Sequence, residues 1–516
     1  MSLADLAARL IVVRMGSNMS PPRYAAEDAD RIAAMLDRHP LGGVLMFNGR
    51  WPDTRDALIR LQSHSDHGLL VTTDMERGLG QQVRGGTIYP HQAAFGHADD
   101  LEATRAFARQ SAEEALACGI HVTYSPVADV DREPQNPIIG ARAFSSDPQR
   151  AARHVRAFIE GVHAGGQFAT AKHYPGHGGT VGDSHAEMPT LNEDRATLEA
   201  TDFVPFRAAI GAGVDLVMTA HVRYPALDPT GTPATRSAPI LQGLLRDEMG
   251  FDGVVATDSL LMAGAKVDGR TEGELAAEML AVGVDLLLDV DDVDDVVAGI
   301  VRAVENGTLA EARLREAFAR VDALRQRVAD RFGPGVFRDP SLAVAPEIVA
   351  APEHAALASR VATAAVEVVR GPLPSLGEGD GTLVLLFKGT PRGNEPEVQP
   401  LGIALAETLP DASYRQIEPT KEGDDALFEE IRAQVEAASN VIIATVARPA
   451  AWRTFGLADR EKRFVQHLMD AHPVTLAVLG DRRGLEGYDA AQAAVVTYSD
   501  EAPSQRALLN VLAGRT

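Results

Sequence analysis

The stretch GFDGVVATDSLLM, residues 250–262, has the pattern of a short buried strand that runs into a polar loop. Seven other runs of this kind occur in the first 290 residues, separated by segments with helical periodicity. They cover residues 8–15, 42–48, 69–76, 120–129, 168–175, 214–222 and 284–289. Eight buried strands that alternate with helices predict parallel βα units, and eight such units close a βα barrel.

A segment rich in proline and glycine, RFGPGVFRDPSLAVAPEIVAAPE at 331–353, follows this first pattern. Six more short apolar runs lie beyond it, which favours an open parallel sheet over a second barrel. We therefore expect an α/β protein with two domains. An N-terminal (β/α)8 TIM-type barrel is predicted over residues 1–332, a linker over 333–360, and a smaller α/β sandwich domain with a mostly parallel sheet over 361–516.

Composition limits the classes of partner. The chain has 516 residues and a formal net charge of −23, which argues against nucleic acids and anionic membranes as partners. No apolar stretch approaches the roughly 20 residues that span a bilayer. The single cysteine, Cys118, excludes an intramolecular disulfide and fits a reducing compartment, and no secretory signal is visible. These features predict a cytoplasmic protein that is a monomer or a homodimer.

Polar side chains follow five of the eight predicted barrel strands. A barrel places its catalytic groups at the carboxyl ends of its strands. A polar residue that merely begins a loop would explain any one of these positions, but it explains the whole set poorly. The residues are Asp74, Asp129, Lys172 with His173, His221 and Asp258.

The segment KHYPGHGGTVGDSH, residues 172–185, contains three histidines and four glycines. A metal site, a phosphate-binding loop and a mobile loop that delivers one histidine are the three alternatives. His-x-His pairs are absent from the chain, and Pro175 and the glycines prevent any assumption of helical spacing between the histidines. The segment also lacks a complete phosphate-loop motif. No metal and no cofactor are therefore expected.

The third alternative depends on the pair Asp183 and His185. A carboxylate two residues from a histidine can orient the ring and raise its basicity, which produces a proton donor and acceptor near neutral pH. The glycines would let this loop close and open, whereas His177 could equally be a surface residue. Asp258 is well placed as a nucleophile at an anomeric carbon, although a helix N-cap would also explain it.

The motifs KHYPGHGGTVGDSHAEMP and GFDGVVATDSLLM resemble glycoside hydrolase family 3, and within it the β-N-acetylhexosaminidase branch. The motifs VTTDMERGLG, SPVADVD, NPIIGARAF and LVMTAHVRYP follow in the family's order, and the second half is more weakly similar to the family's α/β sandwich domain. The resemblance implies that Asp258 is the nucleophile, that His185 is the acid/base and that Asp183 is its partner. It also implies that sugar hydroxyls are bound by Asp74, Arg142, Lys172 and His173.

One motif departs from the family pattern. The branch usually shows Asp-Gln-Glu-Gly-Gly-Arg-Val-x-Arg after the third strand, and its last arginine helps to bind the sugar. This chain has DMERGLGQQVR, so that Gln82 falls near the place of that arginine and Arg84 follows shortly after. Because of this departure, the motif does not determine which sugar is bound, but it does not affect the predicted reaction.

Together, these features predict a retaining exo-β-N-acetylglucosaminidase that acts on a small glycoside or a muropeptide. A histidine acid/base becomes neutral after it gives up its proton, so it tolerates an anionic species better than a carboxylate would. A phosphorylase that uses phosphate in the second step is therefore an alternative, as is a β-glycosidase with another sugar specificity. A sugar-binding module and a metal-dependent hydrolase are the rival classes. The second domain is expected to have a packing or dimerisation role.

Overall fold

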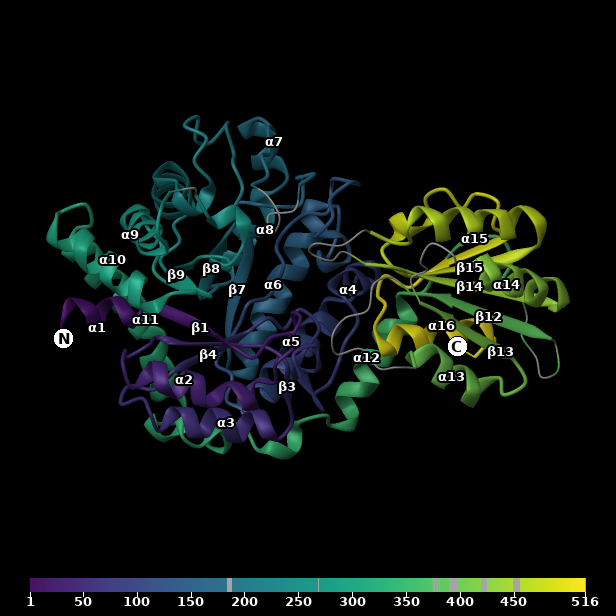
Figure 1. The fold of residues 1–516 in the computed structure, drawn as a ribbon, viewed down its shortest axis with the longest axis horizontal. Helices are drawn as coiled ribbons and strands as arrows, with labels where there is room; N and C mark the ends of the chain where they lie inside the picture. The colour runs from purple at the N-terminus through teal and green to yellow at the C-terminus, as the bar shows by residue number, and fades with distance from the viewer. Residues whose placement is uncertain are drawn as a thin grey trace. The chain divides into compact units, whose positions relative to one another are not determined.

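The computed structural model describes residues 1–182, 188–267, 269–374, 376, 379, 381–388, 398–418, 425–448 and 455–515. The chain forms two compact units (Figure 1). The barrel unit contains Met1–Thr87, Leu101–Asn136 and Ser145–His354. The C-terminal unit contains Ala355–Thr516 together with two segments from the first part of the chain, Ile88–Asp100 and Pro137–Phe144.

Eight parallel strands form the centre of the barrel unit, in the order β10-β1-β2-β4-β6-β7-β8-β9. A parallel bridge between Ala256 and Leu286 joins the two ends of this order, so the sheet closes on itself. Each of the eight predicted runs contains one of the strands, which confirms the predicted barrel. The strands are β1 (Ile11–Met15), β2 (Gly43–Met46), β4 (Leu70–Thr73), β6 (Val122–Thr123), β7 (Phe168–Tyr174), β8 (Leu216–Thr219), β9 (Val254–Ala256) and β10 (Leu287–Leu288).

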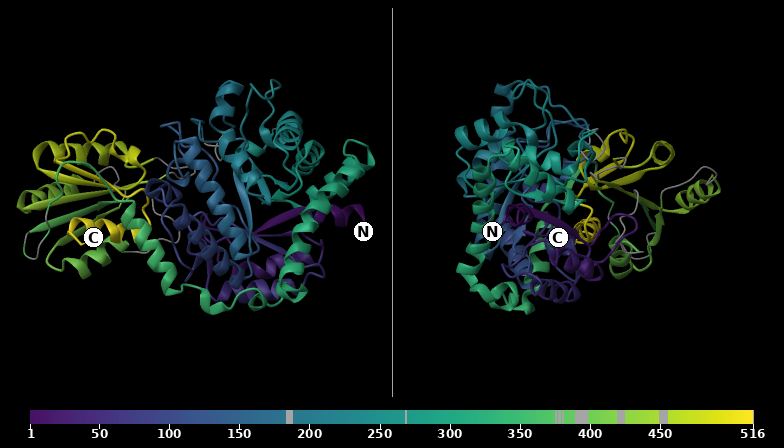
Figure 2. Two further views of the ribbon diagram at one scale, coloured as in Figure 1. Left: turned by 180° about the vertical axis from the view of Figure 1, so that it is seen from behind. Right: turned by 60° about the vertical axis from the view of Figure 1, so that its left-hand side comes forward.

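Helices lie around the outside of these strands (Figure 2). α6 shows why they form where they do: the Asp147 side chain accepts hydrogen bonds from two backbone N–H groups at its start, and Gly166 at φ 98° ends it. The helices are α1 (Leu3–Ala8), α2 (Ala29–Leu36), α3 (Asp53–Gln62), α5 (Leu101–Cys118), α6 (Pro148–Gly165), α7 (Arg195–Ala200), α8 (Phe203–Gly211), η5 (Pro239–Glu248), α9 (Glu272–Val282), α10 (Val293–Glu305) and α11 (Glu311–Phe332). No helix in the described ranges is long and apolar enough to cross a membrane.

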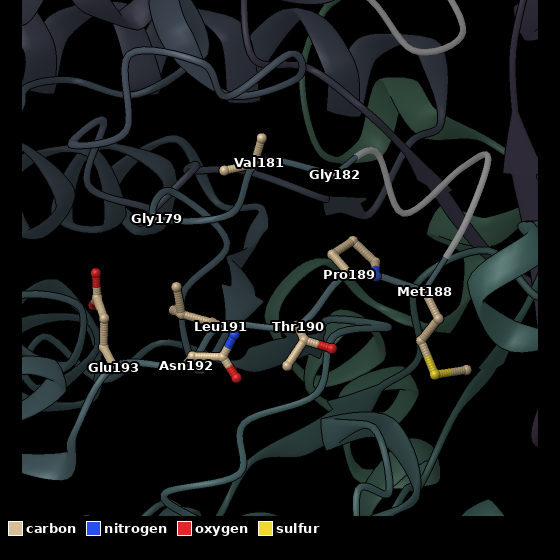
Figure 3. Close-up of a pocket in the computed structure, with 9 residues that line it drawn as sticks. All are labelled: Gly179, Val181, Gly182, Met188, Pro189, Thr190, Leu191, Asn192 and Glu193. Atoms are coloured by element: carbon tan, nitrogen blue, oxygen red, sulfur yellow. The ribbon is translucent and has the colours of Figure 1, made fainter.

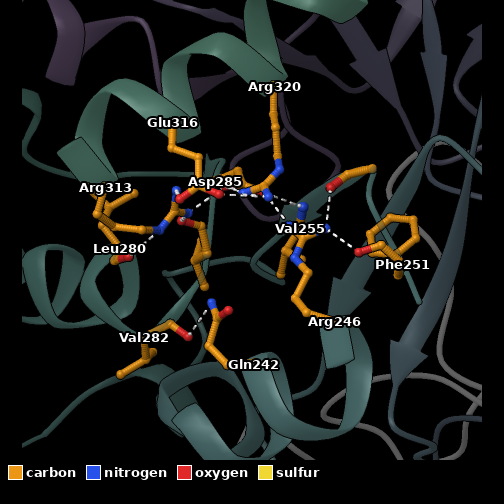
Figure 4. Close-up of polar contacts among 12 residues, drawn as sticks. Gln242, Arg246, Phe251, Val255, Leu280, Val282, Asp285, Arg313, Glu316 and Arg320 are labelled. Atoms are coloured by element: carbon orange, nitrogen blue, oxygen red, sulfur yellow. Dashed lines mark hydrogen bonds and ion pairs between the residues drawn. The ribbon is translucent and has the colours of Figure 1, made fainter. Parts of the chain in front are cut away.

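A buried ionic cluster holds the seam between β9 and β10 at the amino ends of the strands (Figure 4). The Asp285 carboxylate is fully buried and accepts hydrogen bonds from the Val255 backbone N–H at 3.0 Å, from Arg246 at 2.8 Å and from Arg313 at 2.5 Å. Because these partners lie on β9, η5 and α11, one carboxylate ties a strand and two helices to the seam. A small parallel pair, β3 (Gly49–Arg50) with β5 (Val83–Arg84), was not predicted.

The C-terminal unit has a six-stranded sheet in the order β11-β16-β15-β14-β12-β13. β11 runs antiparallel to β16 and the other pairs are parallel, as the prediction of a mostly parallel sheet required. The strands are β11 (Glu367–Arg370), β12 (Thr382–Phe387), β13 (Ser413–Ile417), β14 (Asn440–Ala447), β15 (Val474–Gly480) and β16 (Ala493–Val496). The helices are α4 (Gln92–Ala98), α12 (Pro352–Ala364, which spans the boundary between the units), α13 (Pro400–Thr408), α14 (Asp425–Ala437), α15 (Asp459–Ala471) and α16 (Ala502–Leu512).

Both faces of this sheet are buried. On β12, Leu383 and Leu385 belong to one hydrophobic cluster with side chains of α14 and α15, while Val384 and Leu386 belong to another with side chains of α13 and α16. Figure 1 shows the two pairs of helices on opposite sides of the strands. Alternate residues of a strand point to opposite faces, so this division confirms the predicted α/β sandwich.

The first of the two segments, residues 88–100, is held by residues that follow β16. The His91 Nδ1 atom lies 3.0 Å from the Ser499 hydroxyl, and the His97 ring stacks on Tyr498 with ring centroids 4.2 Å apart. Gly96 allows α4 to contact the second segment, because a Cβ atom there would come within 1.7 Å of the Phe144 carbonyl oxygen. The two segments therefore pack on each other and on the end of the chain within one unit.

Candidate active site

The carboxyl ends of the barrel strands carry the side chains that the sequence singled out. Asp74 follows β4, Lys172 and His173 lie on β7, and Asp258 lies two residues beyond β9. Arg142 ends the short helical turn Gly140–Arg142 of the C-terminal unit, where its guanidinium donates to the Ile138 carbonyl at 2.9 Å. Asp183 and His185 lie outside the described residues.

Lys172 is held between two carboxylates. Its Nζ atom lies 2.6 Å from Asp74 Oδ1 and 2.7 Å from Glu76 Oε1, and its side chain is only 3% exposed. A buried ammonium group is costly unless opposite charges and hydrogen bonds satisfy it, and these two acids do so. The Asp74 side chain is 27% exposed, so this carboxylate is the member of the cluster that solvent or a ligand can reach.

His173 is oriented by the fully buried carboxylate of Asp129. Its Nδ1 atom lies 2.7 Å from Asp129 Oδ2, and the backbone N–H of His177 donates to the same carboxylate at 2.6 Å. Burial alone would raise the pKa of Asp129, but His173 and His177 outweigh it, and the pKa lies below its ordinary value. Because the ionised carboxylate accepts a hydrogen bond from the Nδ1–H group, His173 presents Nε2 to other groups.

His177 is buried, with 1% of its surface exposed, so its interpretation as a surface residue is wrong. Its Nδ1 atom lies 2.7 Å from the Thr180 hydroxyl. Burial lowers its pKa to about 4, against the opposing effect of the Asp129 and Asp258 carboxylates. The ring is therefore neutral at neutral pH, and the influence of both carboxylates places it in the electrostatic environment of the site.

Two glycines of the histidine-rich segment have a packing role. A Cβ atom on Gly178 would come within 1.8 Å of the Val130 carbonyl oxygen, and one on Gly179 within 2.3 Å of the Arg132 guanidinium. The sequence predicts that the glycines let the loop move, whereas these two positions require glycine because the backbone approaches its neighbours closely.

A cavity of about 550 Å³ lies between the described residues on either side of 183–187 (Figure 3). It is lined by Gly179, Val181, Gly182, Met188, Pro189, Thr190, Leu191, Asn192 and Glu193.

Asp258 is fixed by the residues beside it. The Ser259 backbone N–H donates to Asp258 Oδ1 at 2.7 Å, and the Ser259 hydroxyl donates to Asp289 Oδ2 at 2.6 Å. The Arg14 Nε atom in turn donates to Asp289 Oδ1 at 2.8 Å. No helix begins at Asp258, since the next helical turn in the described chain is Ala263–Ala265, so the helix N-cap does not explain this aspartate.

Sequence reasoning missed three residues of this region: Glu76, Asp289 and Arg14. Asp289 is the last residue of the run 284–289, so the rule that polar groups follow barrel strands would have found it. Arg14 lies inside β1 and Glu76 follows Asp74 by two residues, and only their contacts with Asp289 and Lys172 reveal their place.

Among the described residues, one group of histidine and carboxylate side chains is close enough to hold a metal ion: His91, Asp500 and Glu501 of the C-terminal unit. None of them is a predicted site residue. The Arg448 guanidinium lies 2.5 Å from Asp500 Oδ2, and its positive charge opposes a cation at that carboxylate.

Comparisons with known proteins agree with the geometry. Residues 3–324 match the glycosyl hydrolase family 3 N-terminal domain. A beta-hexosaminidase from Tolumonas auensis is 40% identical over 262 residues, which cover 49% of this chain and 76% of the relative.

Two solved structures resemble the whole chain. A glycoside hydrolase family 3 beta-N-acetylglucosaminidase from Paenibacillus sp. superposes with a TM-score of 0.85 at 26% identity, over 100% of this chain and 97% of that one. A beta-glucoside phosphorylase shares the fold, with a TM-score of 0.85 at 21% identity, over 100% of this chain and 93% of that one. The barrel, the polar residues at its strand ends and the match over residues 3–324 lead to one conclusion: the chain belongs to glycosyl hydrolase family 3 and is a glycoside hydrolase.

Proposed function

We propose that the protein is a retaining exo-β-N-acetylglucosaminidase with Asp258 as its nucleophile. The observation that carries this proposal is the position of Asp258, beyond β9 at the carboxyl end of the barrel, where Ser259 holds its carboxylate at 2.7 Å. The choice of sugar is supported by relatives that are named beta-hexosaminidase and beta-N-acetylglucosaminidase.

The reaction we propose has two displacements. In the first, a carboxylate oxygen of Asp258 attacks the anomeric carbon, the bond to the leaving oxygen breaks, and protonated His185 gives its proton to that oxygen. In the second, neutral His185 accepts a proton from water, the water oxygen attacks the anomeric carbon, and the ester bond to Asp258 breaks. Asp183 orients the His185 ring. Two inversions restore the original anomeric configuration.

We assign sugar binding to Asp74, Lys172, His173 and Arg142. The contacts of the first three support this role. Each of these side chains lies at the carboxyl end of a barrel strand and is held in place by an oppositely charged or hydrogen-bonded partner: Asp74 pairs with Lys172, and His173 contacts Asp129. Groups that are fixed before substrate arrives lose little conformational freedom on binding.

We further propose residues 1–332 as the catalytic domain, 333–360 as the linker, and 361–516 as a domain with a packing or dimerisation role.

The anomer released first tests the double displacement. With an aryl β-N-acetylglucosaminide, proton NMR at early times should detect the β-anomer of N-acetylglucosamine before mutarotation. Release of the α-anomer would indicate a single displacement and would rule out Asp258 as a nucleophile. Release of another sugar from a panel of aryl β-glycosides, with N-acetylglucosaminides left intact, would instead overturn the sugar assignment.

A phosphorylase is the second candidate. In that reaction, phosphate replaces water as the attacking group, and a neutral histidine repels this anion less than a carboxylate would. A muropeptide substrate with a carboxylate near the scissile bond, as in cytoplasmic recycling of cell-wall fragments, would benefit in the same way. Products formed in phosphate buffer and in a non-anionic buffer distinguish the two: free sugar in both supports hydrolysis, and sugar 1-phosphate as the main product supports phosphorolysis.

A further inference from the structure

A second cavity lies at the opposite end of the barrel from Asp258. Its volume is about 630 Å³, within the range of small-molecule sites. Arg9 contributes to it just before β1, and His67 and Gly68 contribute just before β4. Arg325 of α11 and Arg338, which follows that helix, complete the basic part of the lining. All of these residues belong to the barrel unit.

Arg325 has its own partners. It is 4% exposed and donates to the Gly68 carbonyl at 2.7 Å, to the Gly42 carbonyl at 3.3 Å and to Asp322 at 2.5 Å. Each nitrogen of its guanidinium therefore has an acceptor, and the Asp322 carboxylate balances its charge. Arg325 lines the cavity, but its guanidinium already has acceptors and needs no ligand to satisfy it.

Arg9 and Arg338 differ from Arg325. The Arg9 Nε atom is buried without a hydrogen-bond partner in the described chain, and the guanidinium lies 5.9 Å from the centre of the Phe318 ring. Within the described ranges neither Arg9, which is half-buried, nor Arg338, which is exposed, forms an ion pair. Asp66, which is exposed, is the one carboxylate of the lining besides Asp322. A buried donor without an acceptor destabilises the folded state, and a bound acceptor would satisfy it.

The histidine beside these arginines reports the local charge. His67 Nε2 lies 2.9 Å from the Leu41 carbonyl and its Nδ1 lies 3.2 Å from the Ser65 hydroxyl, so the neutral ring satisfies both contacts. Burial lowers the pKa of His67 to about 4, and the positive charges of Arg325 and Arg9 add to this effect. At neutral pH the arginines therefore carry the positive charge of the cavity.

We propose that this cavity is a binding site for a small phosphate-bearing anion. Two guanidinium groups without carboxylate partners match the double charge of a phosphate monoester, and guanidinium groups bind phosphate through paired, charge-assisted hydrogen bonds. Barrel enzymes carry out their chemistry at the carboxyl ends of the strands, so a ligand at the amino ends is not the substrate. The site stabilises the barrel when it is occupied and is independent of the sugar reaction.

Thermal unfolding with inorganic phosphate tests the proposal. At constant ionic strength set with sodium chloride, phosphate should raise the Tm of the full-length protein, and Arg9→Gln should weaken the apparent phosphate affinity by about tenfold or more. Arg38→Gln is the matched control, because Arg38 is an exposed arginine of the barrel unit that pairs with Asp294. Equal phosphate responses of Arg9→Gln and wild type would overturn the proposal, since phosphate would then bind elsewhere, for example at the catalytic end.

The titration of His67 gives a readout that does not depend on a variant. A phosphate dianion beside the ring should raise the His67 pKa, as followed by NMR of labelled histidine, while acetate at equal ionic strength should raise it less. An unchanged His67 titration in saturating phosphate would overturn the proposal. An equal effect of acetate would overturn the preference for phosphate and indicate a carboxylate ligand.

Discussion

The hydroxyl of Ser259 donates a 2.6 Å hydrogen bond to the carboxylate of Asp289, and so joins the segment that carries Asp258 to the end of the neighbouring strand β10. Arg14, on the other neighbour of β10, pairs with the same carboxylate. The nucleophile that we propose is therefore positioned by contacts from three adjacent strands. Rigid support of this kind keeps a reacting atom in line with its target.

Replacement of Asp258 by alanine should lower kcat by several orders of magnitude, because no carboxylate remains to form the covalent intermediate. Turnover of an aryl β-N-acetylglucosaminide measures the effect, and circular dichroism checks that the fold is unchanged. Substantial activity in this variant would show that another residue is the nucleophile.

Ser259→Ala should lower kcat by roughly tenfold with little change in KM, because the segment loses its bond to Asp289 while the backbone N–H still donates to Asp258. The matched control is Ser63→Ala at an exposed serine, whose hydroxyl donates to the Arg60 carbonyl. A normal kcat in Ser259→Ala would mean that the Ser259–Asp289 contact does not position the nucleophile.

Lys172→Ala should raise KM and destabilise the barrel unit. Without the ammonium group, the buried Glu76 carboxylate loses the positive charge that lies 2.7 Å from it, and breaking a buried pair in this way costs about 3 kcal/mol. Urea unfolding and steady-state kinetics measure the two effects. Lys172→Arg keeps the charge, so its urea midpoint should return toward that of the wild type, while its KM should remain raised. If Lys172→Ala leaves the urea midpoint unchanged, Lys172 is not the counterion that we describe.

Acidification should destabilise the protein through His177. Its pKa is about 4 in the folded state and 6.5 in an exposed histidine, so between these values the unfolded chain binds a proton that the folded chain does not. This contribution is fully present above about pH 6.5 and is lost as the pH falls toward 4, by up to about 3 kcal/mol. Unfolding free energies from pH 7 to pH 4.5 measure the slope, and His177→Gln should reduce it. An unchanged slope in that variant would assign the pH dependence to other groups.

Tyr498→Ala should raise KM for the sugar, because it removes the ring that stacks on His97 and loosens the packing of α4 against the segment that carries Arg142. Tyr498→Phe keeps the ring, so its KM should remain close to that of the wild type. Equal KM values in all three proteins would show either that this packing does not position Arg142 or that Arg142 does not bind the sugar. Arg142→Ala then separates these two explanations.

The sequence predicted the strands well because each is a short apolar run that its neighbours bury, and a run of apolar residues is visible in the local sequence. Asp258 and Lys172 could be found in the same way, since a polar residue at the end of a buried run is a local signal. The contacts of Arg14 with Asp289 and of Tyr498 with His97 join positions that are far apart in the chain, so no local pattern indicates them. The burial of His177 and the close packing of Gly178 likewise depend on Asp129 and Val130, which lie on another strand's loop.

The C-terminal unit combines residues 88–100 and 137–144 with residues 355–516, which the ribosome synthesises much later. Residues 88–100 and 137–144 leave the ribosome long before Tyr498 and Ser499, the residues that hold the first of them. Because a nascent chain folds from its N-terminus, the barrel strands can assemble before Tyr498 and Ser499 have been synthesised. Translation must therefore pass residues 498 and 499 before these residues can hold His91 and His97.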